Sequence, residues 1–265
     1  MISLGVNTVL FKAFTFAEAA RAIKTAGYDG LEISAIKGMC EHLDPENYKA
    51  QKQGILDALE ETGLRMLAAE VASLDGERLK WAFEAAAELG IPVINVGPGG
   101  KAGDESTLLE SIENLKKLSA MAASYGITLC CKAHVGAAIH NTPTTLRVMA
   151  AISSTGFGID MDPSHIFRAG EKPEEALPAV LGRTRHIHIR DCRGNGPSPG
   201  EPALQACGRG DIDLYGYFRT MVDGGYNGPV CLEIIGPELD MVKAIAIASE
   251  SYGYMNACLK KLGAR

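Results

Sequence analysis

The residue types in this chain that could do chemistry stand at the ends of its short apolar runs. Each of eight runs ends in carboxylate, amide, imidazole or basic side chains: Asn7, Glu32, Glu70, Asn95, Lys132 with His134, Asp162 with His165, His188 with Arg190, and Glu233. Burying so many ionisable groups is costly unless a ligand or a counter-charge meets them. The pattern therefore indicates one polar site that holds a divalent cation, a polar substrate or both.

The carboxylates and histidines of this set offer oxygen and nitrogen donors, which suit Mn²⁺, Mg²⁺, Co²⁺ or Zn²⁺. A cation that bridges adjacent carbonyl and hydroxyl oxygens acidifies the C–H beside the carbonyl, and a nearby base can then remove that proton. Isomerisation, epimerisation and dehydration all begin with this step. We therefore expect a small polar substrate that carries a carbonyl group.

Parallel strands would bring the ends of these runs together. Runs of strand type lie at residues 2–7, 30–34, 64–70, 92–97, 127–134, 156–162, 186–191 and 229–235. Between them, the helical patterns at 14–27, 47–63, 77–90 and 107–126 each end in Gly, which tolerates the left-handed conformation at a helix C-terminus. Eight such units predict an α/β fold, a single (β/α)₈ TIM barrel domain over residues 1–265. The alternative is an open doubly wound sheet, but no G-x-G-x-x-G follows the first run.

In such a barrel, alternate residues of each strand point inward and the active site lies at the C-terminal ends of the strands. Period-two spacing puts Lys132 with His134, Asp160 with Asp162, and His186 with His188 and Arg190 each on one face. We expect Glu70, Asn95 and Arg190 to contact the substrate. The Gly- and Pro-containing stretch from Cys192 to Asp211 is either a loop that covers the substrate or a solvated connector.

Composition narrows the class of protein. With 26 Lys and Arg against 32 Asp and Glu, the net charge is −6, which disfavours a nucleic-acid binder. Seven scattered cysteines suggest reduced thiols in the core. The chain has no run of about 18 apolar residues, so the sequence predicts no membrane span. We expect a cytoplasmic protein with a small-molecule partner and no nucleic-acid or membrane partner. A homo-oligomer is compatible with this sequence, which does not determine the oligomeric state.

Five segments resemble those of the xylose-isomerase-like barrel superfamily of sugar isomerases and epimerases: GYDGLEI (27–33), GIDMDPSH (158–165), HIHIRD (186–191), GRGDID (208–213) and GYNGPVCLEI (225–234). The resemblance spans nearly the whole chain. It implies a divalent metal held by Asp162, His188 and Glu233, with His165 facing the substrate or a second metal.

Lys132 departs from this resemblance. Members similar to tagatose or psicose epimerases have a Glu at this strand-five position, as a metal ligand and as one of two acid–base carboxylates. Three accommodations are open: His134 supplies the missing ligand, Lys132 acts as a base with a lowered pKa, or no metal binds and Lys132 replaces its charge. We take His134 as the fourth metal ligand, ahead of the other two.

With this resemblance, the leading hypothesis is a metal-dependent isomerase or epimerase of a small sugar, keto-sugar or polyol, with Glu233 and Lys132 or His165 as proton-transfer groups. Three further hypotheses remain beside it. Inosose dehydratase-like members carry a segment similar to that around His134, so a lyase acting on a keto-sugar or inosose through the same enolate is the main alternative. Endonuclease IV shares the D-x-x-H and H-x-x-D pieces, but it needs His ligands where this chain has Glu70 and Asn95. A barrel that only binds a ligand rests on Lys132 alone.

Overall fold

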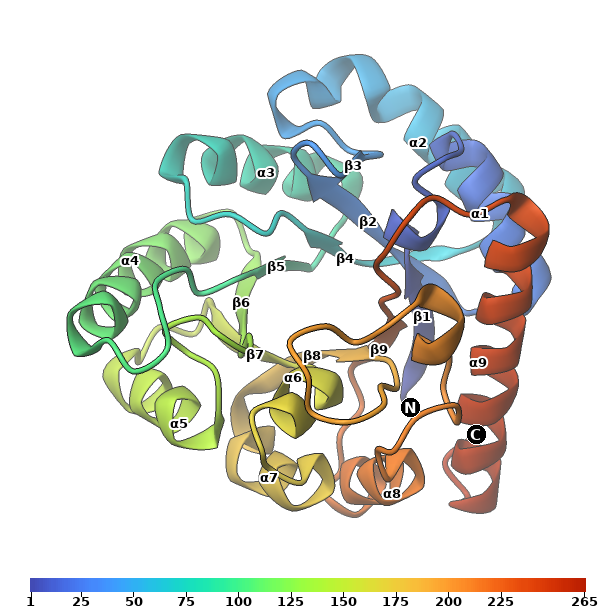
Figure 1. The fold of residues 1–265 in the computed structure, drawn as a ribbon. Coiled ribbons are helices and arrows are strands. Elements are labelled where there is room, and N and C mark those ends of the chain that lie inside the picture. The colour runs from blue at the N-terminus through green and yellow to red at the C-terminus, as the bar shows by residue number, and fades with distance from the viewer.

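The computed structural model describes residues 1–265, and its centre is a closed barrel of eight parallel strands. The barrel strands are β1 (Ser3–Asn7), β2 (Gly30–Ile36), β4 (Arg65–Glu70), β5 (Val93–Val96), β6 (Thr128–Lys132), β7 (Phe157–Met161), β8 (Thr184–Ile189) and β9 (Pro229–Leu232). Because β1 pairs in parallel with both β2 and β9, the sheet has no free edge (Figure 1). The predicted (β/α)₈ barrel is confirmed, and the open sheet is not found.

Helices surround the barrel on its outside (Figure 1). They are α1 (Phe16–Ala26), α2 (Tyr48–Thr62), α3 (Gly76–Leu89), α4 (Glu105–Ser124), α5 (Thr142–Ala151), α6 (Pro163–Arg168), α7 (Pro173–Val180), α8 (Leu214–Asp223) and α9 (Met241–Lys261). The two-residue strand β3 (Cys40–Glu41) pairs antiparallel with the end of β2. None of the helices combines the length and the apolar character that a membrane span requires.

Local sequence explains where the predicted helices begin and end. Thr15 and Glu18 form a capping box at the start of α1, which satisfies backbone N–H groups that have no partner within the helix. The helices α1, α2 and α3 end at Gly27, Gly63 and Gly90, whose φ angles of 100°, 63° and 71° are left-handed. Each helix therefore stops where the next strand must start.

The N-terminal end of the barrel interior is closed by apolar packing. A Cβ atom on Gly5 would lie 2.7 Å from Leu67 Cδ1, and one on Gly30 would lie 2.7 Å from Leu67 Cγ. Glycine at these two strand positions therefore makes room for the leucine between them. All seven cysteines are buried and unpaired, as the prediction of core thiols required. With apolar packing at this end, the polar side chains gather at the C-terminal end.

Candidate active site

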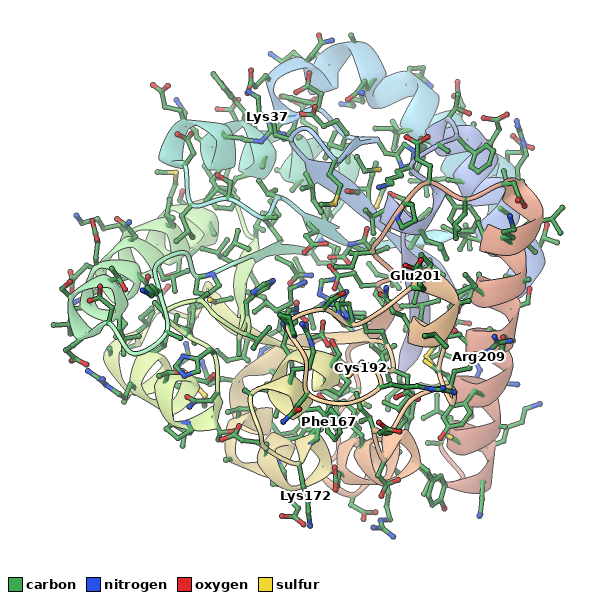
Figure 2. All side chains as sticks on the ribbon, in the orientation of Figure 1. Lys37, Phe167, Lys172, Cys192, Glu201 and Arg209 are labelled. Carbon is green, nitrogen blue, oxygen red and sulfur yellow. The ribbon has the colours of Figure 1, made fainter.

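The polar side chains inside the barrel form two layers that differ in exposure to solvent, although strand register sets some members of the two layers level. Lys132 of β6 is level with Asp160 of β7, and Asp160 is level with His186 of β8. The deeper layer is fully buried, at 0% exposure: Asn7, Glu32, Asn95, Asp160, His186 and His188. Glu70 and Lys132, at 4%, and Glu233, at 3%, keep some contact with solvent. We therefore take these three as the mouth of the site. Figure 2 shows side chains crowding the barrel interior that the ribbon leaves open.

His188 is held as an imidazolium by two carboxylates. Its Nδ1 lies 2.6 Å from Asp160 Oδ2, and its Nε2 is paired with Glu32 Oε2. Burial alone would lower the pKa of His188, but the charges of Asp160 and Glu32 raise it well above its ordinary value. Burial would raise the pKa of Asp160, but His188 and His186 hold it well below its usual range. The contact between His188 Nδ1 and Asp160 Oδ2 is a charge contact only, because Asp160 Oδ2 has no well-aligned hydrogen bond.

Lys132 lies between two carboxylates at the mouth. Its Nζ donates to Glu233 Oε1 at 2.9 Å and to Glu70 Oε1 at 3.0 Å, and it lies 3.3 Å from His188 Nδ1. Burial would lower the pKa of Lys132, but Glu233 and Glu70 raise it above its ordinary value. Lys132 is therefore a fixed positive charge, and the alternative of a lysine base with a lowered pKa does not match this environment.

The two carboxylates beside Lys132 titrate in opposite directions. Burial and the negative charge of Glu233 raise the pKa of Glu70 to about 7. Burial would also raise the pKa of Glu233, but the positive charges of Arg190 and Lys132 hold it well below its ordinary value. At neutral pH the mouth of the site therefore carries one carboxylate that stays ionised and one that exchanges its proton.

Arg190 joins Asp162 to Glu233. Its guanidinium lies 2.8 Å from Asp162 Oδ2 and 3.1 Å from Glu233 Oε2. The second contact is a charge contact only, because Glu233 Oε2 has no well-aligned hydrogen bond. The other oxygen of Asp162 accepts from the backbone N–H and the hydroxyl of Ser164, so Asp162 caps the start of α6. Both oxygens of Asp162 are thus occupied by the protein itself.

His165 is a neutral imidazole behind Arg190. Its Nδ1 faces the backbone N–H of Val135 at 3.2 Å and the guanidinium of Arg168 at 2.9 Å. Its Nε2 faces the guanidinium of Arg190 at 2.9 Å and lies 3.7 Å from Asp162 Oδ2. Burial and the charge of Arg190 keep the pKa of His165 well below its usual range. Because an arginine donor faces each ring nitrogen, His165 is poorly placed to take up a proton.

His134 stands apart from the other predicted site residues. β6 ends at Lys132, and the exposed His134 ring packs on that of His165 with centroids 4.0 Å apart. Its Nδ1 lies 3.0 Å from the carbonyl oxygen of Val135. Asn95, predicted to contact the substrate, lies in the deep layer with its amide donating to Glu32 Oε1 at 2.6 Å. The structure thus brings together all of the predicted site residues except these two.

The donor set expected for a divalent cation does not fit one. A metal ligand must offer a free lone pair, but His188 Nε2 is hydrogen-bonded to Glu32 Oε2, and His188 Nδ1 is enclosed by Lys132 Nζ at 3.3 Å and Asp160 Oδ2 at 2.6 Å. Asp162 is saturated by Ser164 and Arg190, and His134 turns to its own loop. Three other donor groups are compact enough to hold a cation: Asp160 with His186 and His188, Glu32 with Glu70 and His188, and Glu32 with His186 and Cys231. All three groups are buried, and two of them include His188.

Sequence reasoning missed two contributors to the site. Asp160 was placed on the inward face of its strand but given no role, although it fixes the charge of His188. Arg168 was not considered, although it donates to His165 Nδ1 and to the carbonyl oxygen of Pro197. Its spacing of three residues after His165, on a short helix that follows a strand, is a signal that could have identified it.

The stretch from Cys192 to Asp211 is fastened to the barrel rather than left as a free connector. The carboxylate of Asp191, at the end of β8, accepts from the N–H groups of Cys192, Gly208 and Ile212. Gln205 exchanges hydrogen bonds with the backbone of Ile235, after β9. Cys192, Glu201 and Arg209 mark this loop in Figure 2. The loop is therefore held at the C-terminal end of the strands, on the side of Arg168.

A separate cavity lies away from these ionisable side chains. A space of about 780 Å³ opens near the start of β8 and β9, with Thr184, Arg185 and Gly228 in its lining. This is the N-terminal end of the barrel, opposite the polar layers. Because its lining lacks a cluster of buried ionisable groups, we assign the active site by its chemistry and not by cavity size.

Known proteins match this chain in sequence. Residues 20–258 match the family described as xylose isomerase-like TIM barrel. The inosose dehydratase of Clostridium perfringens is 27% identical over 135 residues, which make up 46% of this chain and 45% of that enzyme. The match therefore covers less than half the length of this curated relative.

Solved structures match over nearly the whole chain. The D-allulose 3-epimerase from Methylomonas sp., in complex with D-allulose, has a TM-score of 0.77 and 18% identity, and the match covers 97% of this chain and 96% of the epimerase. The probable 3-DHS dehydratase of Bacillus anthracis has a TM-score of 0.78 and 15% identity, covering 96% and 98%. At these identities the likeness shows the fold alone.

Proposed function

The chain belongs to the xylose isomerase-like TIM barrel family, and from this premise we propose that it is an enzyme that moves a proton beside the carbonyl group of a small sugar-like substrate. Isomerisation or epimerisation of a sugar, keto-sugar or polyol is the reaction that we favour. The names of the epimerase and dehydratase relatives support this substrate class.

One observation carries the proposal. At the mouth of the barrel, a single ammonium group lies within 3.0 Å of two carboxylates, Glu70 and Glu233. A carbonyl oxygen bound near the ammonium would place the neighbouring carbon close to either carboxylate. Proton removal at that carbon needs a base next to a positive charge, and this arrangement supplies both.

The two carboxylates would take different parts in the reaction. Glu70, with a pKa of about 7, can accept and return a proton near neutral pH, which is the property of an efficient acid–base group. Glu233 stays ionised and would orient the ammonium, or receive the proton from the opposite side of the carbon. Arg190, which His165 holds from behind at 2.9 Å, would bind substrate oxygens at the rim. We derive no step through a divalent cation, because the expected ligands do not fit one.

A lyase is the second candidate, and the likeness to inosose dehydratase favours it. Both reactions pass through the same enolate. In the lyase, the enolate expels a hydroxyl group from the next carbon, and the protonated form of Glu70 would supply the proton that leaves with it as water. The products distinguish the two reactions, because only the lyase forms an unsaturated carbonyl compound.

Incubation with panels of ketoses, 3-keto sugars and inososes in D₂O tests the proposed function. NMR would follow deuterium entry at the carbon beside the carbonyl, and ultraviolet absorbance would reveal an unsaturated product. We expect exchange with at least one substrate, and a loss of at least about a hundredfold in Glu70→Gln. If no member of the panels exchanges or reacts, proton transfer on this substrate class is ruled out.

A further inference from the structure

We propose that the ammonium group of Lys132 replaces the divalent cation at this site and itself stabilises the enolate oxygen during proton transfer. The catalytic half of this inference rests on the proposed function. The other half, that the protein binds no divalent cation at the mouth of its barrel, stands independently and can be tested without a substrate.

The position of Lys132 Nζ is the first support. Carboxylate oxygens of Glu70 and Glu233 converge on it, and His188 Nδ1 lies 3.3 Å away. A divalent ion needs lone pairs converging at roughly 2.0–2.6 Å from one point. The carboxylates that could supply them are already bound to the ammonium. A cation among them would have to displace Lys132 and would then be repelled by its charge.

The hydrogens of the ammonium group are the second support. Lys132 has three N–H donors, and two of them point to Glu70 and Glu233. The third points to His188 Nδ1 at 3.3 Å, the longest of the three contacts of this ammonium group. A carbonyl or enolate oxygen of a substrate bound at the mouth would take this third N–H in place of His188.

The balance of charge is the third support. The carboxylates Glu32, Asp160, Asp162 and Glu233 face the positive groups Lys132, His188 and Arg190 within hydrogen-bonded or ion-paired contacts. The remaining carboxyl, Glu70, lies against Lys132. The side chains of the barrel therefore supply three of the positive charges that these buried carboxylates need. With Glu70 protonated, four carboxylates exceed three cations by one charge, so a further double positive charge would exceed what remains.

The proposed step is balanced without a metal. A carboxylate takes the proton from the carbon beside the carbonyl, and the C–H electron pair forms the carbon–carbon double bond. The carbonyl π electrons move onto oxygen, and the resulting enolate oxygen accepts the third N–H of Lys132. Delivery of a proton from the other carboxyl group, in its protonated form, to the opposite face of that carbon returns the electron pairs and yields the epimer. Lys132 remains protonated throughout, so it acts as the electrostatic catalyst.

Titration of the chelator-treated protein with Mn²⁺, followed by the electron paramagnetic resonance signal of the free ion, tests the cation claim directly. We expect no stoichiometric binding at micromolar Mn²⁺ and no rise of Tm with Mn²⁺ or Co²⁺. Binding of one Mn²⁺ per chain in this range would overturn the inference, whichever residues hold the ion. This result depends on neither a substrate nor a variant.

The substitution Lys132→Glu should convert the protein into a Mn²⁺ binder. The new carboxylate would join Glu70 and Glu233, so three acidic groups would converge where the ammonium was. We expect one Mn²⁺ per chain, bound at least tenfold more tightly than by the unchanged protein, and a Tm that rises with Mn²⁺. A folded Lys132→Glu protein that gains no site would contradict the proposal.

Two control variants separate charge from position. Lys132→Met removes the ammonium but adds no oxygen ligand, so it should lose deuterium exchange and gain no Mn²⁺ site. Lys172→Glu makes the same charge change on the outside of α7, where Lys172 is exposed and pairs only with Glu175 (Figure 2). It should keep both the exchange rate and the Mn²⁺ titration of the unchanged protein. A Mn²⁺ site in either control would contradict the role given to position 132.

Discussion

At the mouth of the barrel, neighbouring charges rather than residue type set the protonation of each side chain. Glu70 and Glu233 are the same residue, each within 3.0 Å of the same ammonium group. Glu233 also contacts Arg190, which holds its pKa down, whereas Glu70 is buried against the charge of Glu233, which raises its pKa. This asymmetry is what allows one carboxylate to exchange a proton while the other remains ionised.

The raised pKa of Glu70 predicts a pH-dependent loss of stability. The unfolded chain loses this proton near pH 4.5, and the folded protein loses it near pH 7. The folded state therefore binds more protons between these values, and the free energy of unfolding falls as pH rises through this window. Glu70 alone should lower the free energy of unfolding by about 3 kcal/mol across this window. The free energy of unfolding would be measured by urea unfolding from pH 4.5 to 8. In Glu70→Gln it should fall less steeply with pH than in the unchanged protein.

The comparison with Glu233 provides the control. The folded-state pKa of Glu233 is depressed, so Glu233→Gln should instead lose stability that is present above the unfolded pKa. If Glu70→Gln and the unchanged protein had parallel pH profiles from 4.5 to 7, the raised pKa assigned to Glu70 would be wrong.

Among the elements, the loop after β8 has the most distinctive attachment. The oxygens of Asp191 accept three backbone N–H groups at 2.9, 3.0 and 3.2 Å, from both ends of the loop. Burial raises the pKa of Asp191, but these backbone donors offset part of that effect. The loop also receives Arg168 at Pro197, and Arg168 contacts His165. The loop and the site are therefore joined through one arginine.

Replacing Asp191 with Asn should loosen this loop. The amide keeps one acceptor oxygen and puts a donor where an N–H now points, so we expect a destabilisation of about 1–3 kcal/mol. Hydrogen–deuterium exchange of peptides from 192–211 should become at least tenfold faster. The exposed Asp223→Asn is the matched control and should leave these peptides unchanged. Equal protection of the loop in Asp191→Asn and the unchanged protein would contradict the assigned attachment.

The elements and the inward faces of the strands could be predicted from the sequence, but side-chain partners could not. Period-two alternation placed Asp160 and His188 inside the barrel because both lie within regular strands. The contacts of His134, with the ring of His165 and the carbonyl oxygen of Val135, could not be predicted because β6 ends at Lys132 and alternation no longer applies beyond it. The pairing of Arg190 with Asp162 and Glu233 depends on three separate elements, which spacing along one strand cannot reveal.

On the scale of the whole molecule, barrel closure depends on tight packing at the end opposite the site. Gly5 of β1 and Gly30 of β2 both leave space for Leu67 of β4. β2 pairs with both β1 and β4. β1 also pairs with β9, the last strand of the chain, and this pairing closes the barrel. We propose that residues 1–265 form one domain whose strands are locked by this packing.

Two glycine substitutions test this view of closure. Gly30→Ala would place a methyl group in clash with the carbonyl oxygen of Arg65 and 2.7 Å from Leu67 Cγ, so we expect it to lose about 1–3 kcal/mol of stability from overpacking. Gly54→Ala, within α2, would meet nothing within 4 Å and should gain about 0.5–1 kcal/mol from helix propensity. Calorimetry should show the two Tm values moving in opposite directions. A Gly30→Ala protein as stable as Gly54→Ala would contradict the packing argument.

Deuterium exchange in the presence of a chelator is the most direct measurement of the central claim, that a lysine ammonium between two carboxylates runs proton transfer beside a carbonyl. Purified protein would be treated with EDTA, mixed with the substrate panels in D₂O and followed by NMR, before and after Mn²⁺ is added. The account predicts exchange at the carbon beside the carbonyl, at the same rate in both conditions. Exchange that appears only after Mn²⁺ is added, or no exchange in either condition, would contradict it.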